Sequence, residues 1–162
     1  MQNLFRLVTI ASVIAAIFQI SLGGIVRVTE SGLGCPDWPL CHGQIIPPLD
    51  LTTLIEYSHR LSASLLTLLV LSQVVLSWKF YRPHNRVMSF NIISLFLILI
   101  AAGLGGLTVL TELAWWVVLI HLAVAETALA CLTVSAFLAW TNLNTIDDSK
   151  RIALGGKIVE LT

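Results

Sequence analysis

Leu-Gly-Gly-Ile-Val-Arg-Val-Thr-Glu occupies residues 22–30, and Leu-Gly-Gly-Leu-Thr-Val-Leu-Thr-Glu occupies residues 104–112. Both segments stand at the end of a long apolar run, begin with Leu-Gly-Gly and finish with Thr-Glu. After each segment the chain enters another apolar run that carries one histidine, His59 in the first case and His121 in the second. The sequence therefore predicts two copies of one helical hairpin.

The apolar runs are long enough to cross a membrane. Of the 162 residues, 57% are hydrophobic and 11% are charged, whereas an average soluble domain has about 25% charged residues. A helix needs about 20 apolar residues to cross a bilayer. The predicted fold is an all-α membrane protein, a four-transmembrane-helix bundle over residues 1–141 with a polar cytoplasmic tail at 142–162. The expected spans are roughly 6–27, 55–79, 88–110 and 114–140.

The distribution of basic residues predicts the orientation. Four spans place seven of the nine Lys and Arg residues on one side, and only Arg27 and Arg60 on the other. By the positive-inside rule, both termini are expected in the cytoplasm, with loop 28–54 outside the cell membrane. The first span lacks a small-residue cleavage site, so we expect it to be retained rather than removed as a signal peptide. A net charge of zero gives no indication of nucleic-acid binding.

The long loop contains Cys35-Pro-Asp-Trp-Pro-Leu-Cys41-His42. On the oxidising side of a membrane, two neighbouring cysteines favour a disulfide that makes the loop a compact cap. Two alternatives remain open from the residues alone: a redox-active pair, and a metal site that includes His42. The metal site lacks a fourth ligand and the usual spacing. Trp38, between two prolines, would rest on the membrane surface or over a site below it.

His59 and His121 are expected at similar depth, because their helices run in the same direction and the hairpins are related by an axis along the membrane normal. Two imidazoles from facing helices of a four-helix bundle suit the axial positions of a haem iron. Ala63 and Ala125, one turn further on, leave room for a flat macrocycle. The Gly-Gly pairs would let the first and third helices approach closely. The alternative is that each histidine is only a helix–helix hydrogen-bond donor.

Two charged residues near His59 have no counterpart in the second hairpin. In the register of the histidines, Glu56 aligns with Val118 and Arg60 with Leu122. Glu56 is therefore a candidate catalytic residue, as a proton acceptor or as a carboxylate that stabilises positive charge. Arg60 and Arg27 are candidates to pair with haem propionates. The alternative for Glu56 is a helix-start carboxylate that only pairs with Arg60.

Three further residues inside the spans carry polar or reactive groups. Gln19 is expected to serve helix packing through a helix–helix hydrogen bond, with a cavity contact as the alternative. Glu126 lies mid-membrane on another face than His121, where a proton path or a subunit contact would explain it. Cys131 is expected to be a small core residue.

The pattern Gly-Gly-x-Val-x-x-Thr-x-Ser-Gly-x-Gly-Cys-x-x-Trp-Pro-Leu-Cys-His-Gly at residues 23–43, followed by Ile-Glu-Tyr-Ser-His-Arg at 55–60, closely resembles the N-terminal half of the haem A synthase family. Members oxidise a ring methyl of haem O to the formyl group of haem A for cytochrome oxidase assembly. The resemblance implies that Glu56 is the essential carboxylate, that His59 and His121 are the axial ligands, and that Cys35–Cys41 is an extracytoplasmic disulfide.

The family usually has eight spans in two bundles, one for the substrate haem and one for a haem b cofactor, whereas this chain has four. The resemblance therefore implies a homo-oligomer or a separate partner half, with haem O, haem A, haem b, membrane lipid and the enzyme haem O synthase as possible partners. Two alternative functions stay open. One is a non-catalytic bis-histidine carrier of haem b or electron-transfer cytochrome, and the other is a membrane thiol–disulfide protein.

Overall fold

The computed structural model describes residues 2–80 and 85–159, and in these ranges it contains four α-helices and no β-strand. Each helix has a segment long and apolar enough to cross a membrane. The prediction of an all-α protein with four membrane-spanning helices is confirmed, and the protein is an integral membrane protein. The helices are α1 (Gln2–Val28), α2 (Leu51–Phe80), α3 (Asn85–Leu110) and α4 (Trp115–Val159).

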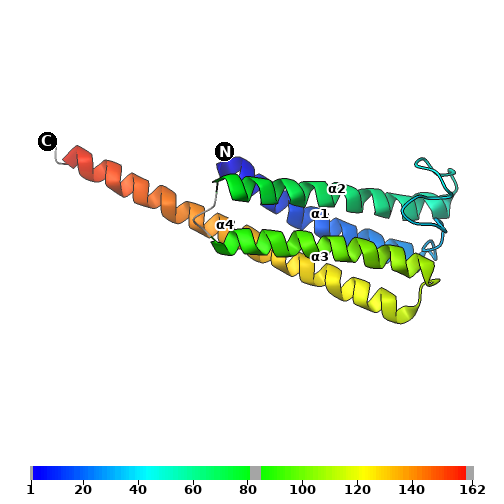
Figure 1. The fold of residues 1–162 in the computed structure, drawn as a ribbon. Helices are drawn as coiled ribbons and strands as arrows, with labels where there is room; N and C mark the ends of the chain where they lie inside the picture. The colour runs from blue at the N-terminus through cyan, green and yellow to red at the C-terminus, as the bar shows by residue number, and fades with distance from the viewer. Residues whose placement is uncertain (1, 81–84, 160–162) are drawn as a thin grey trace.

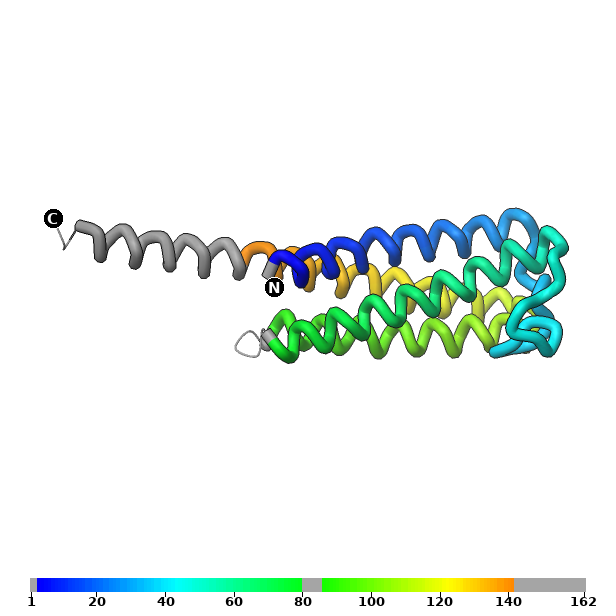
Figure 2. Tube along the Cα trace, turned by 90° about the horizontal axis from the view of Figure 1, so that it is seen from above, coloured from blue at the N-terminus to red at the C-terminus, as the bar shows by residue number. Residues whose placement is uncertain are grey.

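The four helices form a bundle in which each helix packs against two neighbours (Figures 1 and 2). α1 and α3 both lie between α2 and α4, so α1 faces α3 diagonally and α2 faces α4 diagonally. Loop 29–50 and the turn at 111–114 lie at one end, called the loop end below. The start of α1 and the end of α2 lie at the other, called the terminal end. The expected close approach of α1 and α3 through their glycines is wrong, because these helices are diagonal.

α2 begins at Leu51, four residues before the predicted start of its span. The cause is a helix cap: the Asp50 carboxylate accepts hydrogen bonds from the Thr53 main-chain nitrogen (3.1 Å) and the Thr52 hydroxyl (3.0 Å). Hydrogen bonds from these threonines keep the pKa of Asp50 below its ordinary value, with Thr53 as the main cause. Glu56 therefore lies in the second turn of α2 and not in its first turn. The loop before α2 is correspondingly shorter than predicted.

α1 and α3 end in the same way, which is what the repeated segments predict at this place. Glu30 and Glu112 each take a left-handed conformation, with φ of 55° and 50°. Past them, the Ser31 nitrogen donates to the Val26 oxygen (3.0 Å) and the Leu113 nitrogen donates to the Thr108 oxygen (2.7 Å). These six-to-one bonds are those of a Schellman cap. The axis that would relate the two hairpins stays a prediction.

The bundle core has an apolar centre and a polar layer nearer the terminal end. Gln73 of α2, Asn91 of α3 and Ser135 of α4 are fully buried and hydrogen-bonded to one another. Side-chain hydrogen bonds between membrane helices hold neighbours in register. The apolar centre packs side chains from all four helices: Ala16, Leu66, Val70, Ile98, Ala128 and Leu132.

Candidate functional site

His59 and His121 lie on the core-facing sides of the diagonal helices α2 and α4. Seven residues further along each helix, on the same face, stand the buried core residues Leu66 and Ala128. His59 is the ninth residue of α2 and His121 the seventh of α4, so the two imidazoles lie at similar depth below the loop end. Both are half-buried.

Each imidazole is held at Nδ1 by the helix that precedes its own in the chain. Nδ1 of His59 lies 3.0 Å from the side-chain nitrogen of Gln19 on α1. Nδ1 of His121 lies 2.9 Å from the main-chain oxygen of Ala101 on α3. A main-chain oxygen such as that of Ala101 is a partner that orients histidines which bind metals. Gln19 was expected to make a helix–helix hydrogen bond for packing, and it makes one between α1 and α2, with His59 as its partner.

A glycine lies beside each imidazole. A methyl group added at Gly23 would lie 3.1 Å from Cε1 of His59, and one added at Gly105 would lie 3.5 Å from Cε1 of His121. The first contact is tighter than ordinary van der Waals packing. Two imidazoles on opposite helices, at similar depth and each with its ring against a glycine, are the residues that would hold a haem iron. Within the described parts of the chain, no cluster of three or more His, Cys, Asp or Glu side chains suits a bare metal ion.

Glu56 lies one turn closer to the loop end than His59 and is 4% exposed. One carboxylate oxygen, Oε2, accepts a hydrogen bond from the Cys35 main-chain nitrogen (2.8 Å). The other, Oε1, forms an ion pair with Arg60, which lies four residues further along α2. The carboxylate is thus a buried anion whose two oxygens both have donors, placed between the histidine level and the loop.

Arg60 holds the disulfide loop against α2. Beyond its bond to Glu56, its guanidinium donates to three loop main-chain oxygens, those of Cys35 (2.8 Å), Asp37 (2.7 Å) and Leu40 (2.8 Å). Five donors in one planar group allow this many bonds, which a lysine could not make. In this structure the guanidinium therefore organises the loop, and its predicted contact with a haem propionate stays a prediction.

Cys35 and Cys41 form a disulfide, and both are buried. Because the two sulfur atoms are bonded to each other, neither is available as a thiolate ligand for a metal. His42 instead donates from Nε2 to the Gly34 main-chain oxygen (2.8 Å). The structure therefore agrees with the predicted cap and not with the alternative metal site.

The disulfide loop closes through a tight turn that Asp37 stabilises. Its carboxylate accepts from the main-chain nitrogens of Gly43 (2.7 Å) and His42 (2.6 Å), which both have positive φ. These bonds, that of Gly43 first, hold the pKa of Asp37 below its ordinary value against the opposing effect of desolvation. Because the pKa is lowered, the carboxylate stabilises the folded turn at every pH above its ordinary pKa near 4. This stabilisation is lost as the pH falls through the lowered pKa. The turn should be intact at neutral pH.

Trp38 reaches from the loop to α3. A methyl group added at Gly106 would lie 2.7 Å from the Trp38 ring, so only a glycine allows this approach. The sequence left two positions open for Trp38, the membrane surface and a place over a site below. The structure places Trp38 over the end of the bundle, above the level of the histidines. The loop is thus fixed to α2 through Arg60 and to α3 through Trp38.

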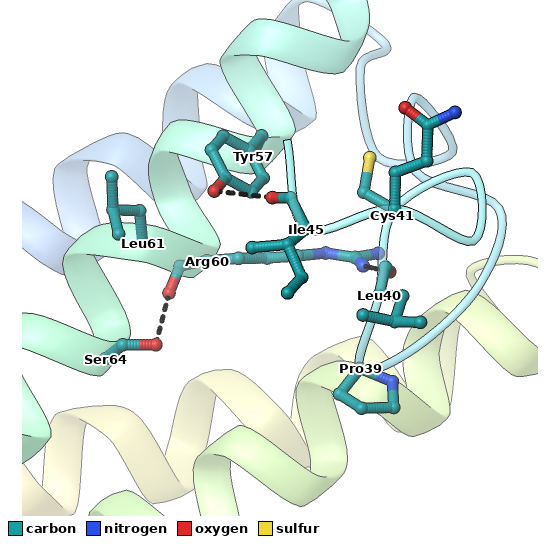
Figure 3. A pocket seen from close by; sticks show the side chains of 9 residues that line it. Pro39, Leu40, Cys41, Ile45, Tyr57, Arg60, Leu61 and Ser64 are labelled. Carbon is teal, nitrogen blue, oxygen red and sulfur yellow. Dashed lines mark hydrogen bonds between the residues drawn. The ribbon is translucent and has the colours of Figure 1, made fainter. Parts of the chain in front are cut away.

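A shallow groove lies between the loop and the outer side of α2 (Figure 3). Its volume is about 170 Å³, below the roughly 300–1,000 Å³ of typical ligand pockets. Arg60 crosses it under the loop, and the Tyr57 hydroxyl donates to the Ile45 oxygen (2.9 Å) at its edge. Neither histidine lines this groove, so we do not assign it to the haem.

The remaining candidates lie apart from the histidines. Arg27 is exposed at the loop end of α1, and Glu126 is exposed on α4 near the middle of the membrane-length segment. Glu126 thus faces away from the bundle interior. Cys131 is a free thiol that is only partly buried, whereas the sequence predicted a core residue. The predicted tail at 142–162 has no described side chains.

Replacing Arg60 by lysine is expected to loosen the disulfide loop. The loss of one hydrogen bond from a charged donor costs about 1.5–3 kcal/mol, so reduction of Cys35–Cys41 by a small phosphine should accelerate at least about tenfold. The rate can be followed by thiol labelling and mass spectrometry, with Cys131 as the constant background. Arg27→Lys, an exposed arginine at the same end, is the control. Equal rates in the two variants would show that Arg60 does not secure the loop.

Comparison with known proteins found related sequences. The sequence model of a family described as cytochrome oxidase assembly protein (COX15-CtaA) matches residues 6–53. A protein of Bacillus pumilus (strain SAFR-032) named heme A synthase is 34% identical over 142 residues, which is 86% of this chain and 46% of that protein. Proteins of the same name from Staphylococcus saprophyticus and Staphylococcus carnosus are 36% identical over 126 residues, 76% of this chain and 41% of theirs. The chain thus spans less than half the length of these relatives.

Proposed function

The chain belongs to the haem A synthase family, and on that premise we propose that it takes part in oxidising a ring methyl of haem O to the formyl group of haem A. The observation that carries this proposal is the pair of histidines on diagonal helices, each seated against a glycine and held at Nδ1. In the proposal, His59 and His121 bind the iron of haem O as substrate. The iron supplies the redox chemistry when the haem is bound.

The other residues of the site act around that haem in the proposal. Glu56, one turn nearer the loop, is the catalytic carboxylate, which stabilises positive charge on the substrate as an anion. The loop with Trp38 and the Cys35–Cys41 disulfide covers the loop end and limits the entry of water. The exposed Arg27 pairs with a haem propionate. Arg60 can bind a propionate only if its guanidinium gives up a hydrogen bond to one of the loop oxygens.

Identification of the bound pigment tests the proposal. The chain is expressed with and without a supply of haem O, purified, and its haem is extracted and identified by mass. We expect haem O in the purified protein, and haem A when the electron acceptor is present in the membrane. Haem b alone, with no conversion, would instead favour the non-catalytic carrier or electron-transfer cytochrome.

We propose that a second four-helix unit packs against the face of α4 that holds Glu126. An exposed carboxylate at the bilayer centre costs about 2.5–3.5 kcal/mol, which a protein partner would remove. The second unit, either a copy of this chain or a separate half, would hold the haem b cofactor that carries electrons away. The supply of haem O requires an enzyme that makes it, so haem O synthase is the proposed donor.

Cross-linking is expected to detect this contact. A cysteine at Ala130, one turn beyond Glu126, should give dimers on oxidation in membranes when Cys131 has been replaced by serine. A cysteine at Leu68, an exposed residue of α2, is the matched control and should give several-fold less. Similar yields at both positions would contradict a contact through α4 between two copies of this chain.

We also propose that the loop end faces outside the cell membrane and that the termini are cytoplasmic. The buried disulfide at the loop end agrees with an oxidising compartment. Arg6, Lys79 and Arg86 belong to helix ends at the terminal end, as the positive-inside rule requires for the cytoplasmic side.

A further inference from the structure

The two histidines are held by chemically different partners at one position of the repeat. Gln19 and Ala101 are equivalent, because each stands three residues before the Leu-Gly-Gly segment of its half. Gln19 offers His59 a side-chain amide nitrogen, whereas Ala101 offers His121 a main-chain oxygen. The same place in the two hairpins therefore supplies a donor in one case and an acceptor in the other.

Ala101 fixes the tautomer of His121. A main-chain oxygen can only accept a hydrogen bond, so the hydrogen of the neutral ring must sit on Nδ1, 2.9 Å away. Nε2 then carries the free lone pair, so Nε2 is the atom that can bind a metal. His121 is thus held in the form that is ready to bind iron.

Gln19 holds His59 in the opposite form. Its NH₂ group donates to Nδ1 at 3.0 Å, so Nδ1 is the acceptor and the ring hydrogen sits on Nε2. The same nitrogen lies 3.4 Å from Nε2 and 3.1 Å from the His59 main-chain oxygen. The amide therefore covers the ring edge between the two nitrogens, and His59 does not offer Nε2 to iron in this arrangement.

Ser62 gives the amide a second orientation. The Ser62 hydroxyl donates to Oε1 of Gln19 and also lies 2.9 Å from the His59 main-chain oxygen. If the amide turns over, Oε1 accepts from Nδ1–H of His59, the NH₂ group donates to the Ser62 oxygen, and the hydroxyl donates to the His59 main chain. The ring, the amide and the hydroxyl each keep a hydrogen bond. Val124, three residues after His121, stands at the equivalent place in the second hairpin and has no hydroxyl to do this.

We infer that His121 is the fixed axial ligand and His59 the exchangeable one, and that Gln19 and Ser62 are the positioning residues that make the difference. The inference rests on the proposed function, because the ligand exchange concerns a haem bound between the two histidines. A site in which haem O enters and haem A leaves requires that an axial bond forms and breaks. One fixed and one exchangeable ligand would let the haem stay oriented while this happens.

Histidine tautomers in the haem-free full chain give the first test. In ¹⁵N-histidine NMR of the purified protein, His59 should carry its hydrogen on Nε2 and His121 on Nδ1. Gln19→Glu offers only acceptors and should move the His59 hydrogen to Nδ1 without affecting His121. Ala101→Ser, which keeps the main-chain oxygen, is the matched control and should change neither ring.

The same tautomer for both wild-type histidines, or a His59 ring that does not respond to Gln19→Glu, would overturn the inference. This measurement needs no haem, so its failure is distinct from a failure of the proposed function, which a lack of haem binding would show.

Carbon monoxide binding gives the second test, in the haem-loaded protein. Reduced haem binds carbon monoxide only after one imidazole has left. Gln19→Glu favours the ligating tautomer of His59 and should slow this binding about tenfold, an effect typical of partners of metal ligands. Gln19→Leu, with no acceptor for Nδ1–H, should bind carbon monoxide faster than the wild type. Unchanged rates in both variants would show that Gln19 does not control the ligand.

Discussion

Purified protein carrying His121→Ala is expected to lose the visible spectrum of a bis-imidazole haem. The loss of a hydrogen-bond partner of a metal ligand costs about 10–100-fold in metal affinity, so the loss of the ligand itself should lower haem occupancy at least that much. His59→Ala should likewise abolish the bis-imidazole spectrum, because only one imidazole remains. The measurement is the absorption spectrum of protein reconstituted with haem, normalised to protein concentration.

His42→Ala is the matched control for both variants. His42 lies at the loop end, is exposed, and donates to a loop oxygen rather than facing the core. Its loss should leave the spectrum unchanged. If His59→Ala or His121→Ala also left it unchanged, the assignment of that histidine as an axial ligand would be wrong.

The histidine pair can be predicted because the sequence carries it twice. The repeated Leu-Gly-Gly segment sets the register, and the apolar runs set the depth, so both rings are expected at one level on one kind of helix. Helix length and composition likewise predict the four helices. The diagonal arrangement of α1 and α3 cannot be predicted in this way, since nothing in a sequence tells which faces of four similar apolar helices meet.

The contact between Gln19 and His59 could have been found by counting. Gln19 stands nine residues before the end of α1 and His59 eight residues after the start of α2, so both lie about 12–14 Å from the loop end. That count needs the correct start of α2. The sequence prediction starts α2 too late because Asp50, Thr52 and Thr53 come soon after two prolines and resemble loop residues, whereas they form a capped first turn.

The partners of Arg60 could not have been predicted. Three of them are main-chain oxygens of the loop, and every residue has such an oxygen, whatever its side chain. The ion pair with Glu56 is visible in the four-residue spacing, but the direction of the guanidinium depends on how the disulfide folds the loop over α2. That arrangement is tertiary, and no local pattern records it.

Glu56→Gln is expected to keep the haem and to lower haem A formation at least about 100-fold, the range for a positioned acid–base or electrostatic group. Glutamine has the size of glutamate and can still accept the Cys35 hydrogen bond, so the loop should stay in place. What it loses is the negative charge one turn above His59 and, with it, the second oxygen that accepts from Arg60. The measurement is pigment extraction from membranes supplied with haem O, together with the bis-imidazole spectrum of the purified variant.

Two controls separate chemistry from structure at Glu56. Glu30→Gln removes an exposed carboxylate at the same end of the bundle and should leave haem A formation unchanged. Arg60→Lys keeps the charge of Glu56 but removes most of the bonds to the loop. If Arg60→Lys loses as much haem A as Glu56→Gln, the ion pair acts by holding the loop. If only Glu56→Gln loses haem A formation, and its Cys35–Cys41 disulfide is reduced at the wild-type rate, the charge itself is required. The unchanged rate would show that the fold around the carboxylate is intact.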